Sequence, residues 1–266
     1  MRNITSTFLT LAIKTIGRLS KGLNISSEHG LTSGLMLDYI YENKSHGKFI
    51  IGKFLDRIFL NNVSWKAIRQ RKQNLKEQIK LAIGENRARG ENTVILDVAA
   101  GPAQYLIDVM SEVGEDGVFA VCQDIDEKWM ASGREKAGEA GLKNIRFEKS
   151  DAFDIDTLSS VSPRPNVIVA SGLYDWIMND ELVKKSLKLC CSVLDDDGTI
   201  IFTNQAGNRQ MNLVHKAFLD FNKEPLRMKT RSPETLNGWA MEAGFKDIIA
   251  TVMDRWGFYS VARIKK

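Results

Sequence analysis

An acid and a tight turn follow one another at residues 94–104 and together suggest a ligand site. Residues 94–98 read Val-Ile-Leu-Asp-Val, and Ala-Ala-Gly-Pro-Ala-Gln follows. Gly101 is the one glycine of this turn, whereas a backbone that approaches a pyrophosphate reads Gly-x-Gly-x-x-Gly. The turn therefore favours a ligand without phosphate, with Asp97 near a cationic group of that ligand. Ala103 opens the next helix, where we expect no left-handed backbone.

A second pair of acids follows the next apolar run. Residues 121–126 read Val-Cys-Gln-Asp-Ile-Asp. An acid at the end of the second strand of a doubly wound sheet accepts hydrogen bonds from ribose hydroxyls. We assign this role to Asp124, with Asp126 as the second choice. The alternative role for Asp124 is to cap the helix that follows.

The elements that must position these residues alternate after residue 92. Continuous apolar runs separated by helical stretches predict a parallel sheet with helices on both faces. The last two runs are separated by Asp254-Arg-Trp-Gly257, which predicts a terminal hairpin. We therefore predict an α/β, Rossmann-like, doubly wound sheet of seven strands, mostly parallel with an antiparallel last strand. The runs are 94–98, 118–122, 145–148, 167–170, 199–203, 245–253 and 258–264.

The chain before residue 92 has a helical pattern. Helical periodicity is present in residues 49–60 and in the charged stretch 63–83. We predict two regions: an N-terminal helical extension or lid over residues 1–91, and a ligand-binding domain over residues 92–266.

The turn at residues 97–103 resembles a motif of a known family. Asp97, Ala99, Gly101 and Ala103 stand in the places of the motif acid-x-Gly-x-Gly-x-Gly, so the segment resembles the cofactor turn of class I S-adenosylmethionine-dependent methyltransferases. Residues 145–153, Ile-Arg-Phe-Glu-Lys-Ser-Asp-Ala-Phe, resemble the third-strand motif of that family.

This resemblance implies a methyltransferase that uses S-adenosyl-L-methionine and releases S-adenosyl-L-homocysteine. It implies that Asp151 accepts from the adenine amine, with Ala152 and Phe153 beside the ring. The full set of expected cofactor contacts is Asp97, Ala99, Gly101, Gln104, Tyr105, Asp124, Ile125, Asp151, Ala152, Phe153 and Ser171.

A finer resemblance involves four separate segments. They are Trp65–Lys72, Leu96–Pro102, Ser171–Asp175 and Asp254–Gly257. Together they resemble a group of bacterial methyltransferases that occur alone or fused to an α/β-hydrolase. The resemblance covers roughly residues 30 to 264 and refines the family without naming a substrate.

The acceptor of the methyl group is expected at the loop after residues 167–170. In this fold that loop faces the transferable methyl, and Tyr174 and Asp175 are our candidate catalytic residues for orienting an acceptor or taking its proton. The alternative role for Tyr174 is packing. The chain lacks both the Asn/Asp-Pro-Pro-aromatic motif and a Pro-Cys nucleophile, which disfavours a nucleic-acid substrate.

Four further residues are candidates for substrate binding. Tyr39 and Tyr41 are expected to line the cofactor mouth, and Arg69 and Arg71 to reach an anionic group of the substrate or the cofactor. The alternative for the arginines is a solvated helix face.

The first helix suggests where the enzyme works. Residues 1–22 carry four cations and no acid, on an apolar stripe. This pattern fits attachment to an anionic membrane surface, and the alternative is packing on the domain. We expect a cytoplasmic protein, peripheral at the inner membrane surface if this helix binds lipid.

Composition excludes several other classes. A formal charge of +4 does not by itself indicate nucleic acid. Three cysteines without Cys-x-x-Cys spacing indicate reduced thiols, and with three histidines we expect no metal site. We therefore predict a methyltransferase acting on a small molecule or a lipid. The alternatives are an RNA methyltransferase with Lys66–Lys80 as a basic track, and a catalytically silent cofactor-binding module.

Overall fold

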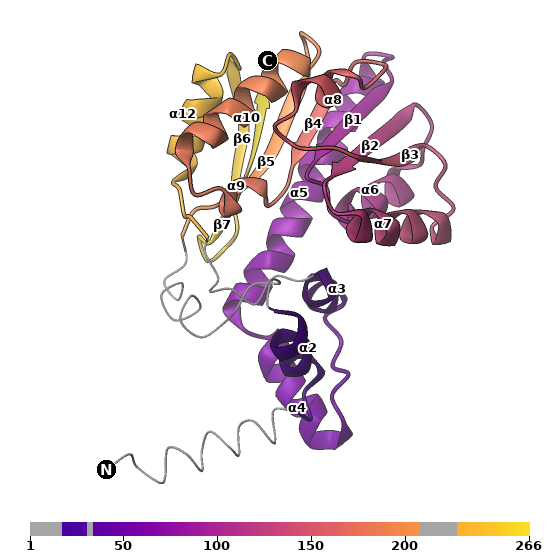
Figure 1. Ribbon diagram of the computed structural model, residues 1–266, viewed down its shortest axis with the longest axis vertical. Coiled ribbons are helices and arrows are strands. Elements are labelled where there is room, and N and C mark those ends of the chain that lie inside the picture. Colours follow the sequence, from indigo (N-terminus) through magenta and orange to yellow (C-terminus); the bar gives the residue numbers. More distant parts are fainter. Residues whose placement is uncertain (1–17, 31–33, 208–227) are drawn as a thin grey trace. The chain divides into compact units, whose positions relative to one another are not determined.

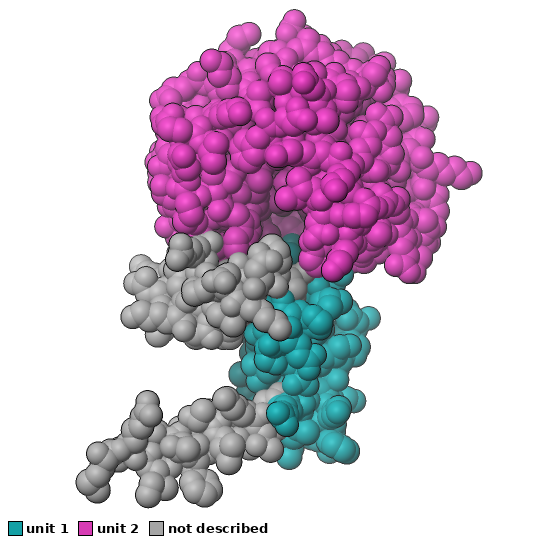
Figure 2. Space-filling model, viewed as in Figure 1, with its two compact units in different colours: residues 1–69, 209–227 teal, residues 70–208, 228–266 magenta. Residues whose placement is uncertain are grey.

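The computed structural model describes residues 18–30, 34–207 and 228–266. The chain forms two compact units, which Figure 2 shows in teal and magenta. Unit 1 comprises residues 1–69 and 209–227, and unit 2 comprises residues 70–208 and 228–266. The units therefore divide between Arg69 and Gln70, earlier in the chain than the division at residue 92 that the sequence suggested.

Unit 2 is built on one seven-stranded sheet, as predicted (Figure 1). The strand order is β3-β2-β1-β4-β5-β7-β6. Neighbouring strands from β3 to β5 pair in parallel, while β7 is antiparallel to both β5 and β6. The strands are β1 (Thr93–Val98), β2 (Val118–Asp124), β3 (Ile145–Lys149), β4 (Val167–Ala170), β5 (Thr199–Gln205), β6 (Asp247–Met253) and β7 (Tyr259–Lys265).

The β6–β7 hairpin owes its turn to one carboxylate. Asp254 accepts hydrogen bonds from the backbone N–H groups of Trp256, Phe258 and Tyr259, at 2.8, 2.9 and 2.5 Å. These bonds close the segment Asp254–Gly257 and bring Tyr259 back to the carboxyl end of β5, where it pairs with Gln205. The predicted terminal hairpin is confirmed.

Helices cover both faces of the sheet (Figure 1). One face packs against α5 (Val63–Ala88) and α6 (Gln104–Val113), and α7 (Glu127–Glu139) contacts α6, β2 and β3. The other packs against α8 (Ile155–Ser159), α10 (Asp180–Val193) and α12 (Pro233–Glu242). The arrangement follows from the strands, because alternate residues such as Ile95 and Leu96 point to opposite faces and both are fully buried.

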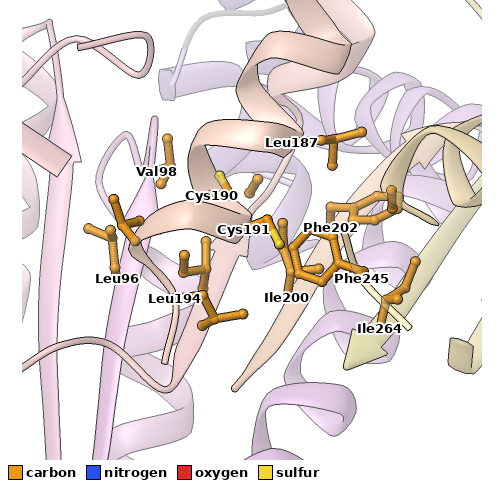
Figure 3. Packing of buried hydrophobic residues seen from close by; sticks show 14 of the residues in the cluster. Leu96, Val98, Leu187, Cys190, Cys191, Leu194, Ile200, Phe202, Phe245 and Ile264 are labelled. Carbon is orange, nitrogen blue, oxygen red and sulfur yellow. The ribbon is translucent and has the colours of Figure 1, made fainter. Parts of the chain in front are cut away.

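The core on the α10 face shows how the sequence places these helices. Cys190 and Cys191 of α10 pack against sheet residues such as Phe202 and Ile264, with Phe245 beside them (Figure 3). All three cysteines of the chain are buried free thiols. Asn179 caps the start of α10 by accepting from the N–H of Glu181 at 2.9 Å.

The later part of α5 belongs to the sheet domain. Leu75, Ile79, Ala82 and Ile83 recur at helical spacing and are buried in the same cluster as Ile95 of β1. This packing explains why the units divide within α5, at residues 69 and 70, although the helix is continuous from Val63 to Ala88.

Unit 1 contains α2 (Lys21–His29), α3 (Gly34–Glu42), α4 (Phe49–Leu60) and the start of α5. Ser20 caps α2 by accepting from the N–H of Leu23. The predicted first helix lies mostly outside the described residues, which begin at residue 18. In the described part of the chain, no helix combines the length and the apolar character needed to cross a membrane.

Candidate functional site

The turn after β1 has an unusual backbone. Ala99, Gly101 and Ala103 all have positive φ angles, of 54°, 56° and 49°. The expectation that Ala103 needs no left-handed backbone is therefore wrong, since its φ and ψ of 49° and 32° lie in the left-handed helical region. Each alanine in this conformation costs about 1 kcal/mol or more relative to glycine. Strain of this kind gathers at ligand sites, where the surroundings hold it in place.

The turn leaves open space at its centre. A Cβ atom added to Gly101 would meet no heavy atom within 4 Å. Ala103 precedes the first residue of α6, and its side chain makes no capping hydrogen bond. The turn can therefore receive a ligand at Gly101.

Asp124 ties the end of β2 to this turn. Its Oδ2 accepts from the N–H of Gly101, and its Oδ1 accepts from the N–H of Asp126, both at 2.8 Å. A carboxylate has about four acceptor positions, so Asp124 retains capacity for ligand hydroxyls. Asp126 instead caps α7, accepting from the N–H of Lys128 at 2.9 Å. This geometry favours Asp124 over Asp126.

The end of β3 lies beside Asp124. The N–H of Ser150 donates to the backbone oxygen of Asp124 at 3.0 Å. The next residue, Asp151, is exposed, and its Oδ1 accepts from the N–H of Phe153 at 2.9 Å. Ala152 and Phe153 are half-buried. Gly101, Asp124 and Asp151, predicted from three separate motifs, thus gather at the carboxyl ends of β1, β2 and β3.

Asp97 is fully buried beneath the turn. Both of its carboxylate oxygens lie 2.7 Å from the hydroxyl of Tyr105, which donates to them. Burial raises the pKa of Asp97 to about 8; the Tyr105 hydrogen bond opposes this shift and the charge of Asp124 contributes to it. Asp97 and Tyr105 therefore form a hydrogen-bonded pair, and a cation placed nearby would favour the ionised form of Asp97.

The remaining expected cofactor residues occupy different environments. The Gln104 amide donates to Asp108, one helical turn later, at 2.9 Å. Ile125 is exposed between Asp124 and Asp126. Ser171 is half-buried and directly follows β4, where the N–H of Gly172 donates to Thr203 Oγ1 at 2.7 Å.

Asp175 is a buried and incompletely bonded carboxylate. It lies on the short helix α9 (Leu173–Trp176), and its Oδ1 accepts from the N–H of Gln205 at 2.6 Å. Its Oδ2 lies 3.6 Å from Arg71 Nη1, and no hydrogen bond from the described residues reaches it. Burial raises the pKa of Asp175 to about 6, while Arg71, the Gln205 N–H and Arg231 oppose the shift. Such a group can exchange a proton near neutral pH.

Arg71 joins segments that are far apart in the sequence. Its guanidinium lies 4.9 Å from the ring centre of Tyr259, besides its ion pair with Asp175. The neighbouring Gln70 accepts from the N–H of Arg255 at 3.1 Å. Residues of the segments Trp65–Lys72, Ser171–Asp175 and Asp254–Gly257, which carried the finer resemblance, therefore meet at the carboxyl ends of β4 and β5.

Tyr174 has a packing role. Its side chain is fully buried, its ring packs edge-on against Phe202 with centres 5.7 Å apart, and its hydroxyl lies 3.5 Å from Ser186 Oγ. Burial raises the pKa of Tyr174 well above its ordinary value. We therefore correct the sequence-based assignment, because a buried hydroxyl that faces α10 in the core is poorly placed to take a proton from an acceptor.

Three of the predicted substrate-binding residues belong to unit 1. Tyr39 is buried, and its hydroxyl donates to Asp56 at 2.5 Å; burial raises its pKa. Arg69 donates to the backbone oxygens of Ile40 and Leu60, at 3.3 and 2.9 Å. These contacts are those of structural residues. Tyr41 is half-buried.

The proposed basic track on α5 is largely paired with acids. Lys72 Nζ lies 2.7 Å from Asp108, and Lys76 Nζ lies 2.6 Å from Glu112. Lys80 also pairs with Glu112, at 2.6 Å. Because α6 neutralises these lysines, they form a ladder between two helices and offer little net charge to RNA phosphates.

The sequence-based prediction does not include the residues that hold the segment 173–177 after β4. Arg231 is buried and donates to the backbone oxygens of Tyr174 and Ile177, at 2.6 and 2.5 Å, and to Asp180 at 2.9 Å. Asn204 donates to the backbone oxygen of Arg231 at 2.7 Å. The polar pair Asn204-Gln205 at the carboxyl end of an apolar strand was a usable signal, whereas nothing in the sequence around Arg231 distinguishes it.

Comparison with known proteins places this geometry in a family. The model of a family described as "Putative methyltransferase" matches residues 1–266. The chain is 34% identical over 259 residues to "Uncharacterized protein YnbC" of Escherichia coli (strain K12). That alignment covers 96% of this chain but 44% of the relative, so the chain spans less than half of that protein's length.

Solved structures share the fold at low sequence identity. A protein of Bordetella parapertussis, described as a possible exported protein, has a TM-score of 0.69 at 14% identity, over 96% of this chain and 86% of its own. The CurJ carbon methyltransferase has a TM-score of 0.64 at 14% identity, over 100% and 72%. The N-methyltransferase NodS of Bradyrhizobium japonicum, solved with S-adenosyl-L-homocysteine, has a TM-score of 0.52 at 12% identity, over 80% and 97%. The chain therefore belongs to this methyltransferase family and has the class I fold of S-adenosylmethionine-dependent methyltransferases.

Proposed function

We propose that this chain methylates a small molecule or a lipid, with Gly101, Asp124 and Asp151 binding the cofactor and Asp175 serving the acceptor. The observation that carries the proposal is the buried Asp175 carboxylate, held by Arg71 at the carboxyl ends of β4 and β5. Ligands of doubly wound sheets bind at this edge.

The residues present fit S-adenosylmethionine. The left-handed turn is open at Gly101, and Asp124 has acceptor capacity for the two ribose hydroxyls. Asp97, under Tyr105, supplies a carboxylate for an ammonium group. A turn with one glycine suits a ligand that has no phosphate. When bound, S-adenosylmethionine supplies an electrophilic methyl group on a sulfonium.

The acceptor side of the site can position a nucleophile and remove its proton. With a pKa raised to about 6, Asp175 is mostly ionised at neutral pH and basic enough to share a proton with an acceptor O–H or N–H. Arg71 is held beside it, and a Cβ on Gly172 would lie 3.9 Å from Arg71 Nη1. The guanidinium is therefore the group that would meet an anionic part of the acceptor or the cofactor carboxylate.

The choice of acceptor class rests on charge. The lysine ladder of α5 is paired with Asp108 and Glu112, which argues against RNA. A lipid acceptor is supported by the cationic, apolar residues 1–22, which would hold the enzyme at an anionic membrane surface. The same fold serves carbon acceptors in CurJ and nitrogen acceptors in NodS.

Two measurements test the proposal. Calorimetry should detect binding of S-adenosylmethionine and none of NAD, and failure to bind S-adenosylmethionine would overturn the cofactor assignment. Incubating the enzyme with S-adenosylmethionine and separate small-molecule, lipid and RNA fractions should give a product one CH2 unit heavier in the first or second. A product in the RNA fraction alone would overturn the acceptor class. Binding without any product would favour the silent module.

A further inference from the structure

Helix α4 has an exposed apolar face. Ile50, Ile51, Phe54 and Ile58 follow one another at helical spacing and are 87%, 59%, 62% and 57% exposed. We call these four residues the α4 apolar face. Soluble proteins seldom expose several large apolar side chains side by side unless the surface binds something.

The orientation of α4 is fixed by its opposite side. Gly52, Asp56 and Leu60 of that side are buried. Asp56 accepts from Ser20 Oγ at 2.5 Å and from the N–H of Gly22 at 3.0 Å, and a Cβ on Gly52 would lie 2.3 Å from the backbone oxygen of Leu19. Because these close contacts hold the side with Gly52, Asp56 and Leu60 inward, the α4 apolar face points outward.

Cations border the α4 apolar face. Lys44, Lys48, Lys53 and Arg57 are exposed, and Lys53 and Arg57 lie on the helix itself. Between residues 43 and 62 the only acid is Asp56, which is fully buried. The exposed surface of this segment therefore combines large apolar side chains with positive charge and no exposed carboxylate.

We propose that the α4 apolar face docks this protein on an anionic phospholipid surface. An interfacial helix inserts its apolar side chains at the boundary between headgroups and acyl chains, while flanking lysines and arginines attract anionic headgroups. The α4 segment has both features. The α4 apolar face consists of residues other than 1–22, and the proposal does not depend on which molecule is methylated.

The test uses the full chain and vesicles of phosphatidylcholine, with and without an equal part of phosphatidylglycerol. In co-sedimentation, the protein should bind the anionic vesicles. The triple variant Ile50→Ser, Phe54→Ser, Ile58→Ser should bind at least about tenfold more weakly, because its apolar insertion is lost. The matched control, Leu81→Ser, Leu182→Ser, Met241→Ser, alters exposed apolar side chains on helices of unit 2 and should bind like the original protein. Equal binding by the α4 variant and the original protein would overturn the proposal.

Two further measurements distinguish a lipid surface from other occupants of the α4 apolar face, namely another segment of this chain or a second copy. Replacing Lys53 and Arg57 by Ala should weaken binding to anionic vesicles, by roughly fivefold for each charge, and an unchanged affinity would count against a lipid surface. The serine variant should keep the thermal stability and the sedimentation velocity of the original protein. A lower melting temperature would show that another segment of this chain covers the face, and loss of a dimer would show that a second copy does; either result overturns the proposal.

Discussion

Two buried carboxylates, Asp56 in unit 1 and Asp175 in unit 2, differ in how they are hydrogen bonded. Asp56 is 0% exposed and accepts four hydrogen bonds, from Ser20, Tyr39 and the N–H groups of Gly22 and His46. Asp175 is 1% exposed, and the described residues give it one backbone hydrogen bond and an ion pair at 3.6 Å.

The difference is the one expected between a carboxylate that holds structure together and one that we propose to act as a base. A buried charge with all its acceptor positions used holds neighbouring segments together, and in unit 1 it joins the start of α2, α3, the α3–α4 loop and α4. A buried carboxylate with one oxygen that accepts no hydrogen bond lacks part of the stabilisation that water would give its charge. This raises its pKa toward the range where the group can exchange protons. Asp56 of unit 1 therefore holds a scaffold together, whereas Asp175 of unit 2 lies on α9, where we propose that the acceptor binds.

The largest expected effect is on methyl transfer by Asp175→Asn. Asparagine keeps an acceptor for the Gln205 N–H but cannot take a proton, so we expect turnover to fall by about 10²–10⁴-fold. The affinity for S-adenosylmethionine, measured by calorimetry, should stay within a factor of about two. The readout is the rate of product formation with the acceptor that gives a product one CH2 unit heavier.

A nearby carboxylate serves as the control for this change. Asp180 is the first residue of α10, is 39% exposed, and pairs with Lys229 and with the buried Arg231. Asp180→Asn should leave turnover within about threefold of the original enzyme. If both variants lost turnover equally, Asp175 would be a support for the loop and not a base.

The second prediction concerns Asp56 and the stability of unit 1. Asp56→Ala leaves four donors in unit 1 without their acceptor and should lower the free energy of unfolding by roughly 3–4 kcal/mol. Denaturant unfolding measures the loss, and hydrogen exchange should locate it in residues 18–60. The free energy of unfolding of Asp56→Asn, which keeps one acceptor oxygen, should lie between those of the original protein and Asp56→Ala. A variant as stable as the original would remove the contrast with Asp175.

A third prediction follows from the pH dependence of stability. Burial raises the folded-state pKa of Asp175 to about 6 from its ordinary value of 3.8, so the folded protein binds this proton more tightly than the unfolded chain. Stability should therefore fall as pH rises from about 4 to about 6, by at most about 3 kcal/mol. Asp175→Asn should remove this part of the fall. The stability of the variant relative to the original protein should therefore be higher at neutral pH than at acid pH. Melting temperatures across this range decide the matter, and parallel curves for the two proteins would refute the prediction.

The sequence predicted the fold well because its periodicity is strong. Continuous apolar runs such as residues 94–98 and 167–170 can be buried on both faces only in a covered parallel sheet, and the break at Asp254–Gly257 required a hairpin. The helix Phe49–Leu60 has the predicted bounds for the same reason. The division of the chain was less predictable, because α5 is continuous and only three-dimensional packing separates Arg69 from Gln70.

The site was predictable where motif and strand end coincide. Asp124 was assigned because it ends an apolar strand, and its bond to Gly101 fits that role. The direction of a side chain cannot be read from the sequence. The sequence therefore predicts the same role for the neighbours Tyr174 and Asp175, although Tyr174 faces the core and Asp175 faces Arg71. Left-handed backbone at Ala103 was also missed, because alanine rarely adopts it unless tertiary structure imposes it.

The smallest effect, and the finest test of the contrast, concerns Asp124. This carboxylate is intermediate between the other two, since each oxygen accepts one backbone N–H and keeps capacity for a ligand. Asp124→Ala should weaken S-adenosylmethionine binding by about 1–3 kcal/mol, roughly 5- to 150-fold, in calorimetry. Asp126→Ala is the matched control: it removes the cap of α7 and should lower stability by about 1 kcal/mol while leaving the affinity unchanged. The opposite pattern would move the ribose contact to Asp126, and Asp124 would then be a structural acceptor like Asp56.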